Sequence, residues 1–164
     1  MAVAVLAGCS GGDPAPAADP LDGSVGLGER LDSAGGAHAV AAITDALDPT
    51  AVGEPVQVAP DEQLVAAVVT ECASTDRAIT VSEKGWSVVL GDGSSVPSRF
   101  EPTAATEGSP SIDETRRVPA GECRYARLLF AVPKDATVAA VHVDAVDDAP
   151  AATWRDTASA SVGD

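Results

Sequence analysis

The stretch Gln63-Leu-Val-Ala-Ala-Val-Val-Thr-Glu-Cys72 decides the fold class. Its length and its valines at 65, 68 and 69 favour a β-strand, and the mixed apolar run fits a strand buried on both faces. A second long run, Cys123-Arg-Tyr-Ala-Arg-Leu-Leu-Phe-Ala-Val132, has the same character. The sequence therefore predicts two long core strands, each carrying a cysteine at one end.

Shorter apolar runs separated by turn signals lie around these two strands. The run 86–90 ends at Gly91-Asp92-Gly93, and Asp-Gly is the strongest short hairpin signal, so 96–100 should return antiparallel to it. The remaining strand candidates are 37–46, 113–118, 138–143 and a short one starting at Trp154, with a mobile loop at 101–112. About seven such strands and no helical period predict an all-β chain, an immunoglobulin-like antiparallel β-sandwich.

Charge and composition exclude several classes of partner. The 164 residues include 10 Lys and Arg against 25 Asp and Glu, a net charge of −15. Nucleic acid is not expected as a partner, because its binding depends on cationic side chains, and adsorption of the domain onto anionic lipid is disfavoured for the same reason. Aromatic residues are only 3% of the chain, too few for a stacking platform. The sequence also has no apolar run of membrane-spanning length.

The beginning of the chain resembles a bacterial lipobox. Leu6-Ala-Gly-Cys9 ends a short apolar run in small residues, and in such a motif the cysteine is acylated and becomes the first residue. We expect residues 1–9 to be a partial lipoprotein signal peptide, with the true start upstream or the chain truncated, since only eight residues precede Cys9. The alternative is an ordinary apolar start with a free thiol.

The rest of the chain divides into three parts. Residues 10–24 are small, acidic and proline-rich, which predicts a disordered linker. Residues 25–155 hold the predicted sandwich, and 156–164 form a flexible tail. This organisation places the domain at the outer face of the cell membrane, anchored by lipid on Cys9.

The other two cysteines fit an exported protein. If Cys9 carries lipid, Cys72 and Cys123 remain, and an oxidising compartment favours a disulfide between them, against the alternative of two buried thiols in a cytosolic protein. Trp86 lies between them, close to the immunoglobulin order of Cys, Trp and Cys on core strands. We therefore expect the disulfide to join the two β-layers. Gly121 stands where antibody-type domains have tyrosine, which argues against a true antibody domain.

Several motifs resemble a known family. They are Val25-Gly-Leu-Gly-Glu29, Ser82-Glu-Lys-Gly-Trp-Ser-Val-Val-Leu-Gly-Asp-Gly93, and Val118-Pro-Ala-Gly-Glu-Cys123 followed by Pro133, Lys134 and Trp154. Together they resemble an actinobacterial-type lipoprotein domain family of unknown function, with an immunoglobulin-like fold and similar to secreted immunoprotective antigens of mycobacteria. The resemblance covers 25–155 and implies a fold rather than catalytic residues; Cys72 and Cys123 are similar to the actinobacterial variant.

Few residues suggest chemistry. His38 and His142 are the two histidines, each in an alternating strand, and there is no Gly-x-Ser-x-Gly elbow, so we assign no catalytic residues and no cofactor. Two carboxylates could in principle catalyse glycoside hydrolysis, but the chain has too few aromatic residues to form the platform on which a sugar would stack. Oxygen ligands for calcium could come from acidic loop residues, although their spacing matches no EF-hand and we assign no metal site. These residues are Asp92, Asp144, Asp147 and Asp148.

Trp86 and Trp154 are the candidate interface residues, because tryptophan is enriched at binding hot spots; the alternative is that both anchor the core. The leading hypothesis is a monomeric, non-catalytic interaction or envelope module with an unknown protein partner. The second is an exported accessory protein that binds a small ligand or a metal ion through loops at one end of the sandwich. A polar-lined pocket would favour the ligand, and an exposed apolar patch would favour the protein partner.

Overall fold

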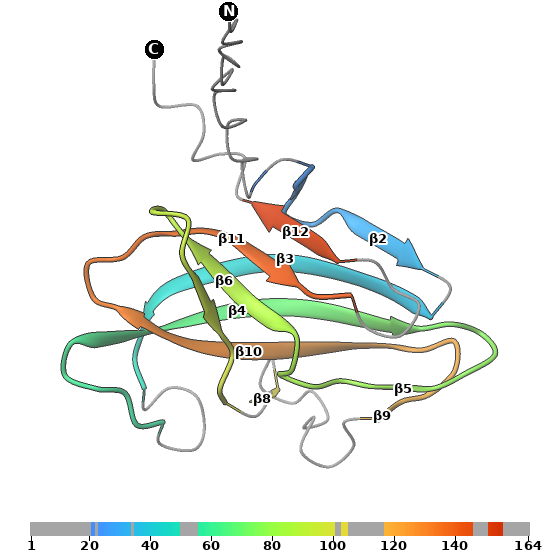
Figure 1. Ribbon diagram of the computed structural model, residues 1–164. Helices are drawn as coiled ribbons and strands as arrows, with labels where there is room; N and C mark the ends of the chain where they lie inside the picture. Colours follow the sequence, from blue (N-terminus) through green and yellow to red (C-terminus); the bar gives the residue numbers. More distant parts are fainter. Residues whose placement is uncertain are drawn as a thin grey trace, which may run out of the picture.

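The computed structural model describes residues 21, 23–33, 35–49, 56–100, 103–104, 117–145 and 151–155, whose regular structure is entirely β (Figure 1). Within these ranges no helix is long and apolar enough to cross a membrane. The predicted all-β sandwich is confirmed, because two five-stranded sheets pack face to face.

Sheet A and sheet B form the two layers. In spatial order, sheet A consists of β1 (Val25–Gly26), β12 (Ala152–Arg155), β11 (Val138–Val143), β6 (Trp86–Leu90) and β7 (Ser95–Pro97). Sheet B consists of β2 (Arg30–Ser33), β3 (Gly36–Leu47), β4 (Glu62–Ala73), β10 (Cys123–Pro133) and β8 (Thr103–Ala104). β5 (Ile79–Thr80) pairs with β9 (Arg117–Val118) as a small third sheet. All pairings are antiparallel except that of β1 with β12.

Most of the predicted strands lie where the sequence placed them. The Asp-Gly hairpin is present between β6 and β7, although β7 ends at Pro97 and is shorter than predicted. The loop expected at 101–112 includes the two residues of β8, which pair with β10, and its other residues lie outside the described ranges. Of the strand expected at 113–118, only Arg117–Val118 falls within those ranges.

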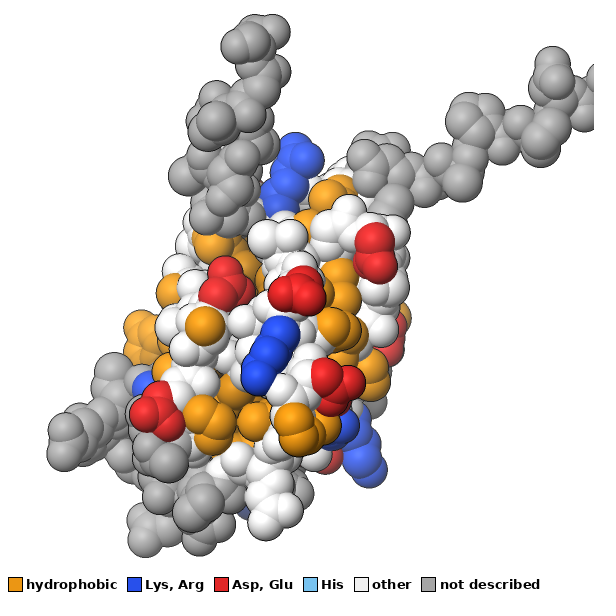
Figure 2. All heavy atoms as spheres, turned by 90° about the vertical axis from the view of Figure 1, so that its left-hand side faces the viewer, with side chains coloured by type: hydrophobic (Ala, Val, Ile, Leu, Met, Phe, Trp, Pro, Cys, Tyr) orange, Lys and Arg blue, Asp and Glu red, His pale blue; other side chains and the backbone are white. Residues whose placement is uncertain are grey.

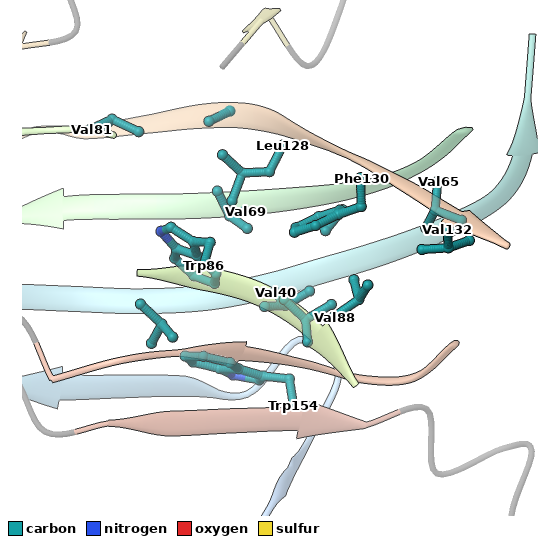
Figure 3. Packing of buried hydrophobic residues seen from close by; sticks show 14 of the residues in the cluster. Val40, Val65, Val69, Val81, Trp86, Val88, Leu128, Phe130, Val132 and Trp154 are labelled. Atoms are coloured by element: carbon teal, nitrogen blue, oxygen red, sulfur yellow. The ribbon is translucent and has the colours of Figure 1, made fainter. Parts of the chain in front are cut away.

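The inter-sheet core is built mainly from valine, leucine and alanine around two tryptophans (Figure 3). Trp86 and Trp154 stack with ring centroids 6.0 Å apart, and Trp154 Nε1–H donates a 2.8 Å hydrogen bond to the Glu29 carbonyl. This bond satisfies the one polar atom of a fully buried indole. Both tryptophans are therefore buried in the core, and neither is exposed as a protein-interface residue, which was the first of the two interpretations of the sequence.

β4 is buried on both faces along its first half, as its mixed apolar run predicted. Val65, Ala67 and Val69 face the inter-sheet core, whereas Leu64 and Ala66 belong to a second apolar cluster with Leu129. The second cluster is on the outer face of sheet B because side chains alternate along a strand. Partly buried side chains from the end of β3, from the β3–β4 connection and from the segment after β7 pack against it; they are Leu47, Val56, Val58 and Phe100.

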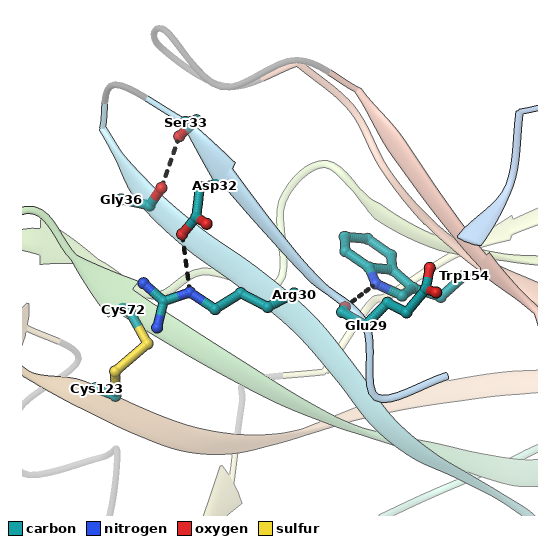
Figure 4. Close-up of polar contacts among 8 residues, drawn as sticks. All are labelled: Glu29, Arg30, Asp32, Ser33, Gly36, Cys72, Cys123 and Trp154. Atoms are coloured by element: carbon teal, nitrogen blue, oxygen red, sulfur yellow. Dashed lines mark hydrogen bonds and ion pairs between the residues drawn. A yellow bond between two sulfur atoms is a disulfide. The ribbon is translucent and has the colours of Figure 1, made fainter. Parts of the chain in front are cut away.

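The disulfide between Cys72 and Cys123 is confirmed, but it does not join the layers. The two residues lie directly opposite each other on β4 and β10, with Cα atoms 4.0 Å apart (Figure 4). The alternation that turns Val69 and Ala73 into the core turns Cys72 to the outer face of sheet B. The bond thus ties two neighbouring strands of one sheet, and the expectation of an inter-layer bond is wrong.

Removing the disulfide should weaken the domain without changing its fold. The variant Cys72→Ala/Cys123→Ala should lose about 2–4 kcal/mol of unfolding free energy, since the bond closes a long loop and so lowers the conformational entropy of the unfolded chain. Denaturant titration of the oxidised protein and of the variant measures this difference. Loss of the native near-ultraviolet tryptophan signal from the variant in the absence of denaturant would contradict the placement of the bond outside the core.

Candidate functional site

A buried acid sits in the interior of sheet B. Glu71 follows Val65, Ala67 and Val69 on the core-facing side of β4, and it is only 4% exposed. Among the described residues it is the one buried charged or polar side chain. A buried carboxylate is costly unless it is paired and hydrogen-bonded, so its surroundings indicate whether this position has a role.

The partner of Glu71 comes from the neighbouring strand. His38 on β3 lies directly opposite Glu71 in the register of the sheet, and its Nδ1–H donates a hydrogen bond to Glu71 Oε2. The imidazole also stands edge-on to Trp86 of sheet A, with ring centroids 6.3 Å apart and planes at 73°. His38 therefore links the buried acid of one sheet to the aromatic core of the other.

On the other side of Glu71, the neighbouring strand β10 carries a cation, Arg124. Arg124 on β10 is opposite Glu71 on its other side, and its guanidinium reaches Glu122 Oε2 at 2.7 Å and the Cys123 carbonyl at 3.2 Å. Arg124 Nε is buried and has no hydrogen-bond partner within the described part of the chain. Three residues that are paired across β3, β4 and β10 thus form one level of sheet B, and they carry an imidazole, a carboxylate and a guanidinium. The preceding core-facing level, around Val69, carries only valine and alanine.

The hydrogen bond that His38 donates to the Glu71 carboxylate raises the pKa of His38 above its ordinary value of 6.5. Burial of the ring opposes this, and the negative charge of the carboxylate raises the pKa further. A histidine whose pKa is higher in the folded than in the unfolded protein stabilises the fold at low pH. This stabilisation is complete below pH 6.5 and is lost as the pH rises through the folded pKa.

This polar level opens into a pocket of about 340 Å³. The pocket lies at the end of the sandwich that carries the β2–β3 hairpin and the β5–β9 pair, at the right in Figure 1. Its polar lining is His38, Glu71, Arg77, Thr80, Ser82 and Lys84, and its apolar lining includes Ala78, Ile79, Trp86 and Val143. Ligand sites commonly have this form, a concave and partly apolar hollow with a few convergent polar groups.

The two cations on the rim have different local surroundings. Lys84 sits in a tight turn in which its own N–H donates to Ser82 Oγ at 3.1 Å, and Gly85 follows with a φ of 81° that favours glycine. Arg77 Nη2 lies 2.5 Å from the point that a Cβ on Gly35 would occupy. A side chain at position 35 would therefore displace this guanidinium, so a glycine there leaves room for it.

The opposite end of the sandwich has a different surface. In Figure 2, which faces that end, acidic and basic side chains are dispersed among hydrophobic ones without a patch of one sign. There Arg99 pairs with Glu62 at 2.6 Å, and Lys134 lines a more open hollow with Glu62. A buried ionisable pair and a pocket thus occur together at only one of the two ends, as far as the described residues show.

The structure separates the two histidines that the sequence offered. Whereas His38 faces the core of the sandwich, His142 lies on the outer face of sheet A, with Nδ1 2.8 Å from Thr153 Oγ1 and Nε2 3.4 Å from Asp144 Oδ1. Asp144 is largely exposed, and Asp92 accepts hydrogen bonds from the N–H and Oγ of Ser94 within the β6–β7 turn. The two histidines cannot serve one site.

The candidate calcium ligands are not brought together in the part of the chain that the structure describes. No group of three or more His, Cys, Asp or Glu residues there could hold a metal ion. Asp147 and Asp148 lie outside the described residues, as does Cys9, the predicted lipid attachment site.

Sequence reasoning missed the acid at the centre of this site. Glu71 occupies an inward position of the period-2 pattern formed by Val65, Ala67 and Val69, and a charge at such a position is the signal that could have revealed it. Lys84 and Arg77 carry no comparable signal, because isolated cations in turns are common on any surface.

No protein-family model and no curated protein sequence matches this chain. A secreted protein from Mycobacterium tuberculosis, MPT63, is similar in structure, with a TM-score of 0.53, 16% identity, and coverage of 80% of this chain and 95% of MPT63. An uncharacterised β-sandwich protein from Clostridium difficile 630 gives a TM-score of 0.56 at 14% identity, covering 80% of this chain and 92% of its own.

The fold is an immunoglobulin-like β-sandwich similar to that of MPT63. At these identities the likeness concerns the fold alone. It confirms the part of the predicted resemblance that concerns architecture, and membership of a lipoprotein family stays a prediction.

The pairing of His38 with Glu71 makes a titration prediction. In the wild-type protein the His38 ring should titrate above pH 6.5, and in Glu71→Gln its midpoint should fall, because burial, which lowers the pKa, would then act without the carboxylate. Nuclear magnetic resonance of the imidazole ¹³C and ¹⁵N signals across pH 4–9 reads this directly. The signal of His142 is the internal control, since the substitution is in the other sheet. An equal His38 midpoint in both proteins would show that the pair does not form.

Proposed function

We propose that this chain is an extracytoplasmic, non-catalytic binding domain whose ligand site is the pocket between the β2–β3 hairpin and the β4–β6 connection. The observation that carries the proposal is the buried pair of Glu71 and His38 at the base of that pocket. A buried ion pair in a small core contributes little net stability compared with apolar residues of similar size, so its presence at the base of a pocket supports a role in recognition. This corresponds to the second hypothesis from the sequence, an exported accessory protein that binds a small ligand through loops at one end of the sandwich.

Less supports a face that binds a protein partner. Among the described residues, Tyr125 is the one large hydrophobic side chain that is exposed, and a single exposed residue is ordinary for a soluble domain. The two tryptophans that could have marked an interface are buried. The interaction-module hypothesis therefore remains a prediction without a surface that supports it.

The location outside the membrane is part of the proposal. One feature of the sequence and one of the structure support it, namely the lipobox-like Leu6-Ala-Gly-Cys9 and the disulfide, which is typical of oxidising compartments. In this view a lipid on Cys9 holds the domain at the outer face of the cell membrane, and the acidic segment 10–24 separates it from the headgroups.

Blocking the pocket tests the proposed ligand site. A set of anionic, cationic and neutral aromatic fragments is first screened for members that shift the Trp86 indole signal of the wild-type protein. Ala78→Trp should fill the hollow, so that these fragments no longer shift the signal. Ala151→Trp adds the same bulk at an exposed position outside the pocket and should leave fragment binding unchanged. Fragments that shift only signals elsewhere, or that bind Ala78→Trp as well as the wild type, would contradict the proposal.

Lipid attachment is tested separately. In a bacterium with lipoprotein-processing enzymes, the chain expressed behind a lipoprotein signal peptide that ends at Cys9 should incorporate an alkyne-labelled fatty acid, and Cys9→Ser should abolish the label while Ser10→Ala keeps it. The labelled protein should partition into the membrane fraction. Unlabelled protein released into the medium would rule out the anchor but would leave the ligand site untouched.

A further inference from the structure

The pocket gathers basic side chains in a strongly acidic protein. Although the chain has a net charge of −15, the pocket lining contains Lys84 and His38 against one acid, Glu71, and Arg77, whose charge acts on the neighbouring Asp76, also lines it. The chain has only two lysines in total, Lys84 and Lys134. One of the two is therefore at this pocket, in a protein whose acids outnumber its bases by 15.

The single acid does not determine what a ligand meets. Glu71 is 4% exposed, and its carboxylate accepts the hydrogen bond of His38 within the protein. A protonated His38 balances that carboxylate, and a neutral one still covers part of it. The groups left to face an incoming molecule include the Lys84 ammonium and the apolar wall.

Lys84 is the cation that is best placed to meet a ligand. Its backbone is held by the Ser82 turn, and the next residue but one, Trp86, is anchored in the core. Its side chain is exposed at the rim, and no hydrogen bond or ion pair to the Lys84 ammonium is found among the described residues. The neighbouring acid of the same turn, Glu83, lies 3.5 Å from Ser82 Oγ and is not part of the lining.

The walls of the pocket favour a ligand with an apolar body. Ile79, Trp86 and Val143 come from three elements, β5, β6 and β11, and line one continuous hollow beside the cations. Its volume of about 340 Å³ is at the lower end of the range for small-molecule sites, which favours a compact molecule.

We propose that the pocket binds a small organic anion, with a carboxylate-type head at the Lys84 ammonium and an apolar body against Ile79 and Trp86. This inference rests on the proposed function and adds the chemical class of the ligand. An organic cation would be repelled by the Lys84 ammonium, and a neutral molecule of the same shape would lack a charge-assisted hydrogen bond.

Three probes of one shape separate these cases: benzoate, benzylammonium and benzyl alcohol. Reductive methylation with ¹³C keeps the positive charge of lysine and gives signals for the chain's only two lysines, which the variants Lys84→Gln and Lys134→Gln assign. At constant ionic strength, benzoate should shift the Lys84 signal and the Trp86 indole signal and leave the Lys134 signal in place. The other two probes should leave the Lys84 signal unshifted.

The variants supply the matched control. Judged by the Trp86 indole signal, the dissociation constant for benzoate should rise by about tenfold in Lys84→Gln, which loses one charge-assisted bond. It should not change in Lys134→Gln, which removes the same charge at the opposite end of the sandwich. Both residues are exposed, so neither variant should affect folding.

The possible failures are distinguishable. If benzyl alcohol or benzylammonium shifts the pocket signals and benzoate does not, the anion inference is overturned while the proposed ligand site stands. If benzoate binds equally to Lys84→Gln and the wild type, the assigned contact is wrong. If benzoate shifts no pocket signal at any concentration up to its solubility, the inference is overturned, and the blocked-pocket experiment with other fragments decides the proposed function.

Discussion

The register of β4 between β3 and β10 determines which side chains enter the sandwich and which face outward. Because the side-chain period of a strand is two, Val65, Ala67, Val69 and Glu71 share the core side, and Cys72 belongs to the other. A slip of one residue would bury the cystine and expel the acid. The apolar core on one side and the second cluster around Leu64 on the other hold this register from both faces.

This register explains why one end of the sandwich holds the pocket whereas the middle is closed by an apolar core. Where valine and alanine face sheet A, the layers close on each other around Trp86 and Trp154. One level further along β4, Glu71 cannot be covered by apolar side chains alone, because a buried carboxylate needs a partner. His38 supplies it from β3, and the same level of the sandwich stays open as a pocket. The core and the candidate site are thus consecutive levels of one strand pattern.

The strands of the centre could be predicted from the sequence because their signals are local. Length and β-branched residues in 64–72, the Asp-Gly turn after Leu90 and the Pro-Ala-Gly turn before Cys123 each act within a few residues. β2 and β5 were not predicted, since Arg30–Ser33 and Ile79–Thr80 are too short and too polar to show a period. The pairing of the cysteines followed from their number, but their side of the sheet depended on the register of β4 and β10.

The candidate site was out of reach for a related reason. His38 and Glu71 are 33 positions apart in the chain, and they meet only because β3 and β4 pair in one particular register. Pairing register is a property of the folded sheet, whereas composition and spacing describe single segments. The odd inward charge at 71 was visible in the sequence; its partner, the pocket and the rim cations required the structure.

The central claim is that Glu71 and His38 face the tryptophan core and that the cystine faces away from it. Nuclear Overhauser spectroscopy of the oxidised protein tests this most directly, because it reports which protons lie within a few ångströms of the Trp86 indole. The account predicts cross-peaks from the His38 ring protons to Trp86, and none from the β-protons of Cys72 or Cys123. Cross-peaks from the cystine to Trp86, as in a bond that spans the two sheets, would contradict it.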